Sequence, residues 1–427
     1  MRSVVIGGGI AGLLAARVLA ERGPVVLVER DTGTGARRGA PQGRHLHGLL
    51  DRGRRIVEEL HPGFTDELVA AGALTAEPLV QTRWFLHGRR LHPTRTGLRS
   101  VLASRPLIED VLRRRSVVRV QEGSATGLEL DAGRIAGVRL ADGATLAADL
   151  VVDASGRASR LPDHFVELGL RAPREDRVDV GLGYATRTYR RLPHDLGGDL
   201  NVLVSTVPRS RGGGAMAVEG DRWLVTLAGL LGDHPPLDDI GFRAFAASLP
   251  AGPVGNIVAH GEPLDDPVPF RFRGSRHRRY DLHRCLPEGL VVVGDSVCSL
   301  NPLYAQGMTL AAQQVTALRA WDGRRTRDVN RTIGRLCTAA WKIATRADLA
   351  LPEVGGYRPL PARVLDAYVT RVQRVGHADP AVARALIRVA NLTDPSAALL
   401  HPRILGRVLR PGSDRVVPHE APVGVPA

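Results

Sequence analysis

A glycine-rich turn near the N-terminus constrains the fold more than any other feature of the chain. It follows a short strand predicted over residues 3–6 (Ser-Val-Val-Ile), and its glycines are Gly7, Gly9 and Gly12, in the spacing Gly-x-Gly-x-x-Gly. In this motif the first glycine makes the tight turn, the second admits a diphosphate and the third lets a helix pack closely on the strand. The sequence therefore predicts a dinucleotide-binding strand–turn–helix unit.

The segment after the turn completes this unit. Residues 13–22 have helical periodicity, and residues 25–28 form a second apolar strand that ends at Glu29. The amides at the start of the helix can hold a diphosphate, and a carboxylate at the end of the second strand can accept hydrogen bonds from ribose hydroxyls. We therefore predict that Glu29 and the adjacent Arg30 contact the dinucleotide.

The middle of the chain favours FAD over NAD. Short strands are predicted over residues 117–120, 125–130 and 134–140, with tight turns at residues 131–133 and 141–143. A nicotinamide dehydrogenase would continue its parallel α/β repeats here. A β-meander inserted into a nucleotide-binding fold is typical of glutathione-reductase-like flavoproteins, so we predict FAD.

A second candidate site lies about 280 residues further on. The apolar strand predicted over residues 289–293 is followed by Gly294 and Asp295, then by Pro302, and a helix is expected to begin near Gly307 and Met308. A carboxylate at the end of this strand can hold the ribityl or ribose hydroxyls of an extended FAD. The helix start can direct its amides at the flavin pyrimidine edge.

Charge and composition exclude several classes of function. The 427 residues include 58 lysines and arginines against 44 aspartates and glutamates, a formal net charge of +14, and Lys342 is the one lysine. Aromatic residues make up 4% of the chain, and its arginines occur in small scattered groups rather than in a recognition motif. We therefore expect no nucleic-acid partner, while an acidic carrier protein that brings the substrate remains open.

The cysteines and the apolar segments bear on metals and location. Cys285, Cys298 and Cys337 lack the spacing of a zinc site, and an odd number argues against a disulfide scaffold. No apolar run reaches the roughly 20 residues of a membrane span, and Arg17 interrupts the N-terminal run that resembles a targeting segment. The sequence predicts a cytoplasmic protein with no metal site and no membrane contact.

The two predicted sites together resemble the FAD-dependent monooxygenases of the para-hydroxybenzoate hydroxylase type. The likeness is greatest to the actinobacterial polyketide-tailoring branch, which includes the flavin epoxidases of polyether biosynthesis. It extends over about residues 1–350 and is more specific for the flavoprotein family than for the substrate. The segments that carry it are residues 39–47, 103–107, 149–160, 180–186, 221–226, 286–308 and 341–348.

The resemblance implies the reaction. FAD would be reduced by NAD(P)H, react with O₂ and, as a C4a-hydroperoxide, epoxidise or hydroxylate a hydrophobic, polyketide-like secondary metabolite. Epoxidation is favoured over aromatic hydroxylation. The resemblance also implies that Gln42 and Arg44 approach FAD and that Arg105, at a helix start, reaches its phosphates or adenosine. An arginine is well suited to a diphosphate.

One motif departs from the hydroxylase pattern. The chain has Asp153-Ala-Ser-Gly156 where the hydroxylases carry Gly-Ala-Asp-Gly, so the docking of a nicotinamide is open. The same form occurs in flavin halogenases and prenyl reductases. Halogenases use an active-site lysine, and the one lysine here is Lys342, far along the chain. Two alternatives stay open: a prenyl-type double-bond reductase, and a non-redox cyclase that keeps FAD as a scaffold.

The catalytic residues cannot be assigned from the sequence, because the flavin would perform the chemistry. Three side chains are pocket candidates: His45 and His47, two apart on the loop after Glu29, and Tyr304. Cys298 is interpreted as a packed residue rather than a nucleophile.

The expected fold class is α/β, with a glutathione-reductase-like FAD-binding (Rossmann) domain that carries the inserted β-meander, an antiparallel-sheet substrate domain and C-terminal helices. The helices are expected either to cover the pocket or to form a homodimer. The predicted boundaries are residues 1–74, 101–164 and 286–325 for the FAD-binding domain, 75–100 and 165–285 for the substrate domain, 326–410 for the helices and 411–427 for a flexible tail.

Overall fold

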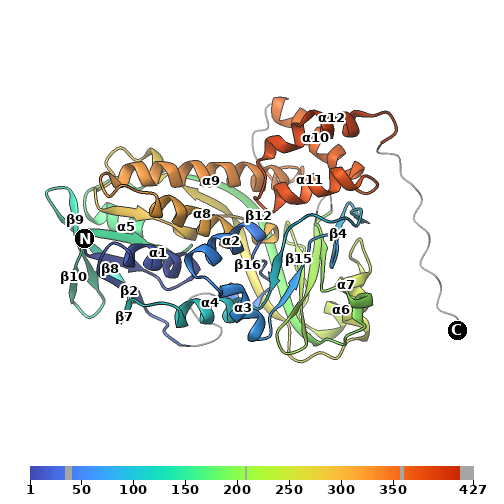
Figure 1. Ribbon diagram of the computed structural model, residues 1–427, viewed down its shortest axis with the longest axis horizontal. Coiled ribbons are helices and arrows are strands. Elements are labelled where there is room, and N and C mark those ends of the chain that lie inside the picture. Colours follow the sequence, from blue (N-terminus) through green and yellow to red (C-terminus); the bar gives the residue numbers. More distant parts are fainter. Residues whose placement is uncertain (34–40, 207–208, 356–359, 414–427) are drawn as a thin grey trace.

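A five-stranded parallel sheet forms one end of the molecule, which we describe from a computed structural model (Figure 1). The structure describes residues 1–33, 41–206, 209–355 and 360–413, so Gly39, Ala40 and most of the expected tail lie outside the described residues. The sheet has the order β17-β11-β1-β2-β7. Its strands are β1 (Ser3–Ile6), β2 (Val25–Glu29), β7 (Arg119–Glu122), β11 (Leu150–Asp153) and β17 (Leu290–Val292).

The register of this sheet brings three distant turns to one edge. Ile6 of β1 pairs with Asp153 of β11, and Asp153 pairs with Val292 of β17, all in parallel. Because parallel strands end at the same edge, the turns that follow these residues lie side by side. Ligands of open α/β sheets bind at this carboxyl edge.

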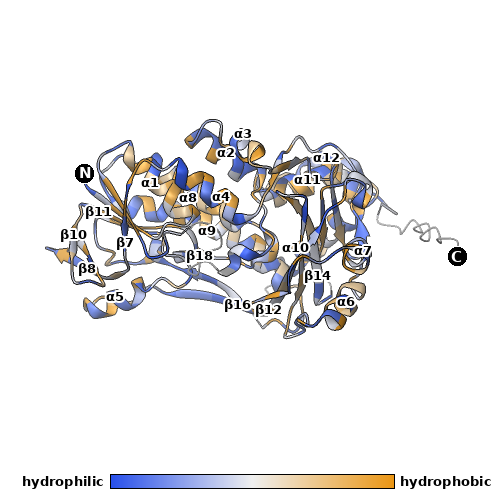
Figure 2. Cartoon of the chain, turned by 90° about the horizontal axis from the view of Figure 1, so that it is seen from below, coloured by the Kyte–Doolittle hydropathy of each residue, from blue (hydrophilic) through white to orange (hydrophobic). Residues whose placement is uncertain are grey.

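Helices cover the parallel sheet. α1 (Ile10–Ala20) and α8 (Gly307–Arg319) lie against each other, with hydrophobic segments where they meet (Figure 2), and α9 (Thr326–Asp348) packs beside α8. One hydrophobic core joins the strands to these three helices, and α9 contributes Val329, Ile333 and Cys337. The remaining helices of this part are α2 (Asp51–Leu60), α3 (Phe64–Ala70), α4 (Arg105–Arg114) and α5 (Leu161–Glu167).

The inserted meander is smaller than predicted. It consists of β8 (Ala125–Asp131), β9 (Arg134–Leu140) and β10 (Thr145–Ala147), joined antiparallel. The strand expected over residues 117–120 is not part of it: that strand is β7, shifted to Arg119–Glu122 and paired in parallel with β2. A short apolar run does not reveal its pairing partner, so its assignment to the meander was wrong.

An eight-stranded sheet forms the other end of the molecule (Figure 1). It is antiparallel, as predicted, except where β4 and β13 pair in parallel. Two short helices, α6 (Asp239–Ala247) and α7 (Pro253–His260), cover one face. The strands are β4 (Thr82–Leu86), β5 (Arg89–Arg90), β12 (Glu175–Arg190), β13 (Asn201–Val204), β14 (Arg211–Val218), β15 (Arg222–Gly229), β16 (Val268–Arg278) and β18 (Cys298–Ser299), while β3 (Leu74–Ala76) and β6 (Ser100–Leu102) pair separately.

Three C-terminal helices form a separate unit beside this sheet: α10 (Leu360–Val375), α11 (Pro380–Ala390) and α12 (Pro402–Leu409). Their buried side chains share a core with Leu91 and Leu98. None of their described residues lines the cavity, so the structure does not support the first of the two expectations, that they cover the pocket.

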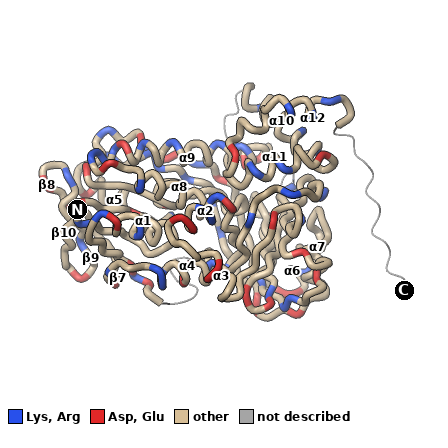
Figure 3. Tube along the Cα trace, in the orientation of Figure 1, with Lys and Arg blue, Asp and Glu red and all other residues tan. Residues whose placement is uncertain are grey.

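Positively and negatively charged residues are interspersed along the chain at both ends of the molecule (Figure 3). Many arginines are paired with carboxylates, as in Arg388 with Asp394 and Arg211 with Asp233. None of the helices in the described ranges is long and apolar enough to cross a membrane.

Candidate functional site

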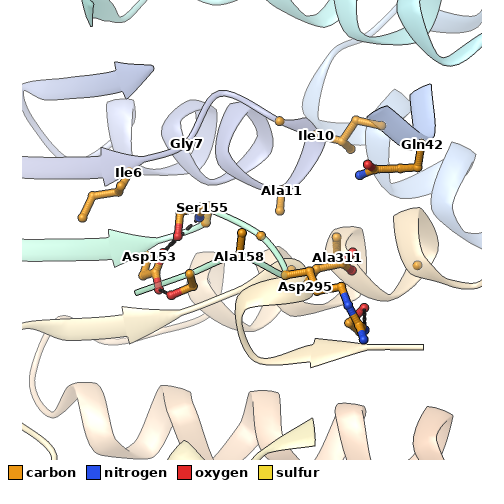
Figure 4. A pocket seen from close by; sticks show the side chains of 18 of the residues that line it. Ile6, Gly7, Ile10, Ala11, Gln42, Asp153, Ser155, Ala158, Asp295 and Ala311 are labelled. Atoms are coloured by element: carbon orange, nitrogen blue, oxygen red, sulfur yellow. Dashed lines mark hydrogen bonds between the residues drawn. The ribbon is translucent and has the colours of Figure 1, made fainter. Parts of the chain in front are cut away.

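A cavity of about 870 Å³ lies at the carboxyl edge of the parallel sheet. Its lining includes Gly7 and Ala11 from the first turn and helix, Ser155 from the turn after β11, and Asp295 from the turn after β17, all arranged around one space (Figure 4). The volume is within the roughly 300–1,000 Å³ of ligand sites. The eight-stranded sheet contributes Tyr184, Phe270 and Phe272 to the lining.

The glycine turn has the geometry that its motif predicts. Gly7 has a φ of +99°, and a Cβ there would lie 2.6 Å from the carbonyl oxygen of Ala154. A Cβ at Gly12 would lie 1.8 Å from the carbonyl oxygen of Gly7, so only glycine lets α1 approach β1 this closely. Gly9 precedes α1 and lines the cavity, where the free amides of the helix start can bind an anion.

Glu29 closes one part of the cavity at the end of β2. Its Oε2 accepts a hydrogen bond of 2.5 Å from the amide of Gly8, and its Oε1 accepts one of 2.9 Å from the amide of Asp31. A carboxylate oxygen has more than one lone pair, so both oxygens can also accept from ribose hydroxyls. Arg30 lines the cavity beside it.

Asp295 lines the cavity at the turn after β17. Burial raises its pKa, and the charges of Arg105 and Arg157 act in the opposite direction. Two cations therefore stabilise a buried anion that can accept from ligand hydroxyls.

Arg157 is a site residue that the sequence-based prediction missed. Its Nη1 donates to Ser299 Oγ at 2.9 Å, its Nη2 donates to the carbonyl of Gly274 at 2.7 Å, and its guanidinium lies 4.4 Å from the ring centre of Phe272. It follows the glycine turn after a parallel strand, the same place as Gly7 and Asp295 in their turns. The rule that ligands bind at strand ends could have identified it.

Asp153 locks two of these turns together. Its Oδ1 accepts from the amide and the hydroxyl of Ser155, at 2.9 and 2.5 Å, and its Oδ2 accepts from Ser159 Oγ at 2.5 Å. Ser296 Oγ, next to Asp295, accepts from the amide of Gly156 at 2.8 Å and lies 3.3 Å from Asp153 Oδ1. The displaced carboxylate of this motif therefore binds its own turn and the turn of Asp295.

The structure separates the polar residues predicted on the loop after Glu29. Gln42 and His47 line the cavity together with Arg105. Arg44 is exposed and is absent from the lining, so the structure does not support its predicted approach to FAD. Arg44 ends a single short 3₁₀ turn, Pro41–Arg44, which directs neighbouring side chains to different sides.

His45 packs behind the cavity wall rather than in the lining. Its Nδ1 is hydrogen-bonded to Thr186 Oγ1 at 2.8 Å, and its ring meets the ring of Tyr184 edge-on at 4.6 Å. Burial lowers its pKa to about 4, with a smaller effect of the charge of Arg44, so the ring is neutral at physiological pH.

Tyr304 does not line the cavity, contrary to expectation. Its hydroxyl donates to Asp348 Oδ1 at 2.7 Å, and Asn301 Nδ2 donates to the same oxygen at 2.8 Å. Asp348 is 1% exposed and its Oδ2 has no hydrogen-bond partner. The cluster fixes the turn of Pro302, which does line the cavity.

This cluster predicts a pH-dependent stability. Burial raises the pKa of Asp348 from 3.8 to about 6, so the folded state binds its proton more tightly than the unfolded state. Stability from this group is present at low pH and is lost as the pH rises from about 4 to about 6. We expect the Asp348→Asn protein not to lose this stability. The difference in unfolding free energy, variant minus wild type, should therefore rise by about 1 kcal/mol between pH 5 and pH 8.

Urea denaturation of both proteins at the two pH values measures this difference. The exposed Asp322→Asn is the control, for which we expect no such change. If the difference in unfolding free energy between Asp348→Asn and wild type is the same at pH 5 and pH 8, Asp348 is not the source of the pH dependence.

The second half of the predicted site surrounds the start of α8. Gly294, Pro302, Gly307 and Met308 all line the cavity with Asp295. Gly294 has a φ of +66°, and a Cβ there would lie 2.8 Å from the Cβ of Ala11, so the turn presses directly on α1. In the described ranges, no group of three or more His, Cys, Asp or Glu side chains could hold a metal.

These donors and acceptors fit FAD. The amides at the start of α1 suit its diphosphate, and Glu29 and Asp295 suit hydroxyl groups at two separate places. Arg105 adds a positive charge to the lining. The helix start at Gly307 suits the electron-rich edge of a reduced flavin.

The fold is that of the FAD-dependent monooxygenases and related flavin enzymes. It is similar to PqsL, a probable FAD-dependent monooxygenase from Pseudomonas aeruginosa, with a TM-score of 0.62 and 18% identity, over 83% of this chain and 97% of that chain. HpxO from Klebsiella pneumoniae, solved with FAD and uric acid, has a TM-score of 0.62 and 18% identity over 96% and 97% of the two chains. The flavin-dependent brominase Bmp2 gives 0.60 and 15% over 96% and 93%. The predicted fold class is confirmed.

The chain belongs to the family of protein Rv3254 from Mycobacterium tuberculosis. The two are 32% identical over 445 aligned positions, which cover 95% of this chain and 93% of that protein. A family model described as tryptophan halogenase matches residues 105–178, a minor part of the chain that runs from α4 to the start of β12.

Proposed function

We propose that the chain is a FAD-dependent monooxygenase that uses NAD(P)H and O₂ to oxygenate a hydrophobic, polyketide-like substrate. The observation that carries this proposal is the composition of the cavity. The parallel-sheet part contributes the dinucleotide fingerprint and Asp295 to the lining, and the eight-stranded sheet contributes Tyr184, Phe270 and Phe272. A cofactor bound by the first group of residues would present its ring to a substrate held by the second.

Bound FAD would supply the redox and oxygen chemistry, and the residues of this chain would bind, orient and exclude water. Glu29 and Asp295 would hold hydroxyl groups of the cofactor and Arg105 would bind its diphosphate, while Asp153 keeps the turn of Asp295 in place. Leu46, Tyr184 and Phe270 in the lining would exclude water from the reacting atoms.

Epoxidation fits the lining better than phenol hydroxylation does. A phenol hydroxylase benefits from a side chain with a pKa near neutrality that removes the substrate proton. Burial lowers the pKa of His47 to about 3 and raises that of Tyr184, so neither of these side chains is suited to that role. Epoxidation of an alkene needs no such base.

Halogenation is the second candidate, because a tryptophan halogenase model matches residues 105–178. That range contains the start of α4, the meander and the turn of Asp153, which belong to the expected cofactor side. The cavity lining has no counterpart of the active-site lysine that halogenases use, because Lys342, the one lysine of the chain, is exposed on α9. These observations favour oxygenation over halogenation.

The proposed reaction is tested with labelled oxygen. The FAD-loaded protein is incubated with NADPH or NADH under ¹⁸O₂ and with a panel of polyenes and phenols. We expect a polyene product that carries one labelled oxygen. A halogenated product in the presence of bromide, or a cyclised product without label, would overturn the proposal in favour of its alternatives.

A further inference from the structure

We propose that His47 is a positioning residue that holds Arg105 in the cavity through its ring Nε2 atom. This inference rests on the proposed FAD site, in which Arg105 is the lining arginine assigned to the cofactor diphosphate. Neither His47 nor its contact with Arg105 follows from the glycine motif or from the strand-end rule.

The hydrogen bonds of His47 fix its tautomer. Its Nδ1 lies 2.9 Å from the carbonyl oxygen of His45, and a carbonyl oxygen can only accept, so the ring proton is on Nδ1. Nε2 therefore carries a lone pair. Arg105 Nη1, which can only donate, lies 3.4 Å from Nε2, at the long end of a hydrogen bond.

The charge state of His47 agrees with this arrangement. Burial and the nearby charge of Arg105 lower the pKa of His47 to about 3, while its hydrogen bond to His45 acts in the opposite direction. The ring is thus neutral throughout the physiological range, and its acceptor atom is always present. A protonated ring would have lost this acceptor and would repel Arg105.

Arg105 is held from its other side by Glu109. Its Nε donates to Glu109 Oε1 at 2.9 Å, and Arg113 Nη2 donates to Glu109 Oε2 at 3.2 Å. The side chain of Arg105 is 15% exposed and that of Glu109 is 3% exposed. A guanidinium has five N–H donors, so these two contacts leave donors free for a phosphate group.

The segment of His45 and His47 is itself anchored on the eight-stranded sheet. Thr186 Oγ1 of β12 binds His45 Nδ1 and lies 2.7 Å from Thr226 Oγ1 of β15, which accepts from the amide of Leu46 at 3.2 Å. The carbonyl of His45 then orients His47. This chain of contacts links Arg105 to the eight-stranded sheet, which contributes the aromatic part of the cavity lining.

Two substitutions of similar size separate the role of Nε2 from that of Nδ1. Asparagine places its amide near the position of Nδ1 and offers Arg105 nothing. Glutamine reaches the position of Nε2 and offers Arg105 an oxygen. We expect His47→Asn to raise the dissociation constant of FAD about tenfold and His47→Gln to change it less than about twofold.

The measurement is a titration of the apoprotein with FAD, followed by quenching of flavin fluorescence, with circular dichroism to verify folding. The exposed His260→Asn is the matched control, with an expected unchanged constant. Equal constants for His47→Asn and wild type would overturn the proposal. Failure of the wild-type protein to bind FAD would instead refute the proposed function.

A double-substitution cycle tests whether His47 acts through Arg105. In an Arg105→Met background we expect His47→Asn to have no further effect, because the group that it positions is gone. The same tenfold loss in that background would show that His47 contacts the cofactor by itself, and would overturn its assignment as a positioning residue.

Discussion

Asp295→Ala is expected to give a folded but nearly colourless protein, with an affinity for FAD reduced about 100-fold. The carboxylate lies at the end of β17 in the cavity, and burial raises its pKa, so its desolvation is already part of the folded state. Its removal deletes an acceptor for ligand hydroxyls from the cavity, which disfavours the bound cofactor.

The absorbance of the purified protein near the flavin bands, and the FAD dissociation constant of the apoprotein, measure this effect. Asp322→Ala, at an exposed carboxylate far from the cavity, is the control and is expected to retain full colour. Full FAD occupancy in Asp295→Ala would contradict the assignment of this residue.

Gly12→Ala is expected to destabilise the cofactor domain by about 3 kcal/mol or more and to abolish FAD retention. The added Cβ would lie 1.8 Å from the carbonyl oxygen of Gly7, and that atom belongs to backbone that cannot rotate away. α1 must therefore move off β1, and the movement displaces the helix start that faces the diphosphate.

Gly252→Ala is the matched control. Gly252 precedes α7, has a φ of −71°, and a Cβ there meets nothing within 4 Å. Thermal melting should show a large decrease for Gly12→Ala and almost none for Gly252→Ala. Similar melting temperatures for the two variants would mean that the close approach of α1 to β1 is not essential.

The elements that carry local chemistry were predictable from the sequence. A glycine turn between an apolar strand and a helix leaves few alternatives, and β1, α1 and β2 lie within three residues of their predicted bounds. The same holds for Asp295, because a carboxylate that ends a buried strand is placed by the register of the parallel sheet.

The contacts made between distant segments were not predictable. Arg44 and Arg105 are both arginines beside a motif, and only the packing of α4 against the loop shows that Arg105 reaches the cavity while Arg44 is exposed. Tyr304 was expected in the pocket. Its hydroxyl instead donates a hydrogen bond to Asp348, which lies 44 residues further along the chain. Hydrogen bonds of this kind have no signal in a single sequence.

Oxygen uptake by the FAD-loaded protein is the most direct test of its proposed class. We expect addition of NADPH or NADH to start consumption of O₂ that matches nicotinamide oxidation and that depends on FAD. A fully FAD-loaded protein that converts a substrate without consuming O₂, or that transfers hydride to an alkene under anaerobic conditions, would contradict the assignment as a monooxygenase.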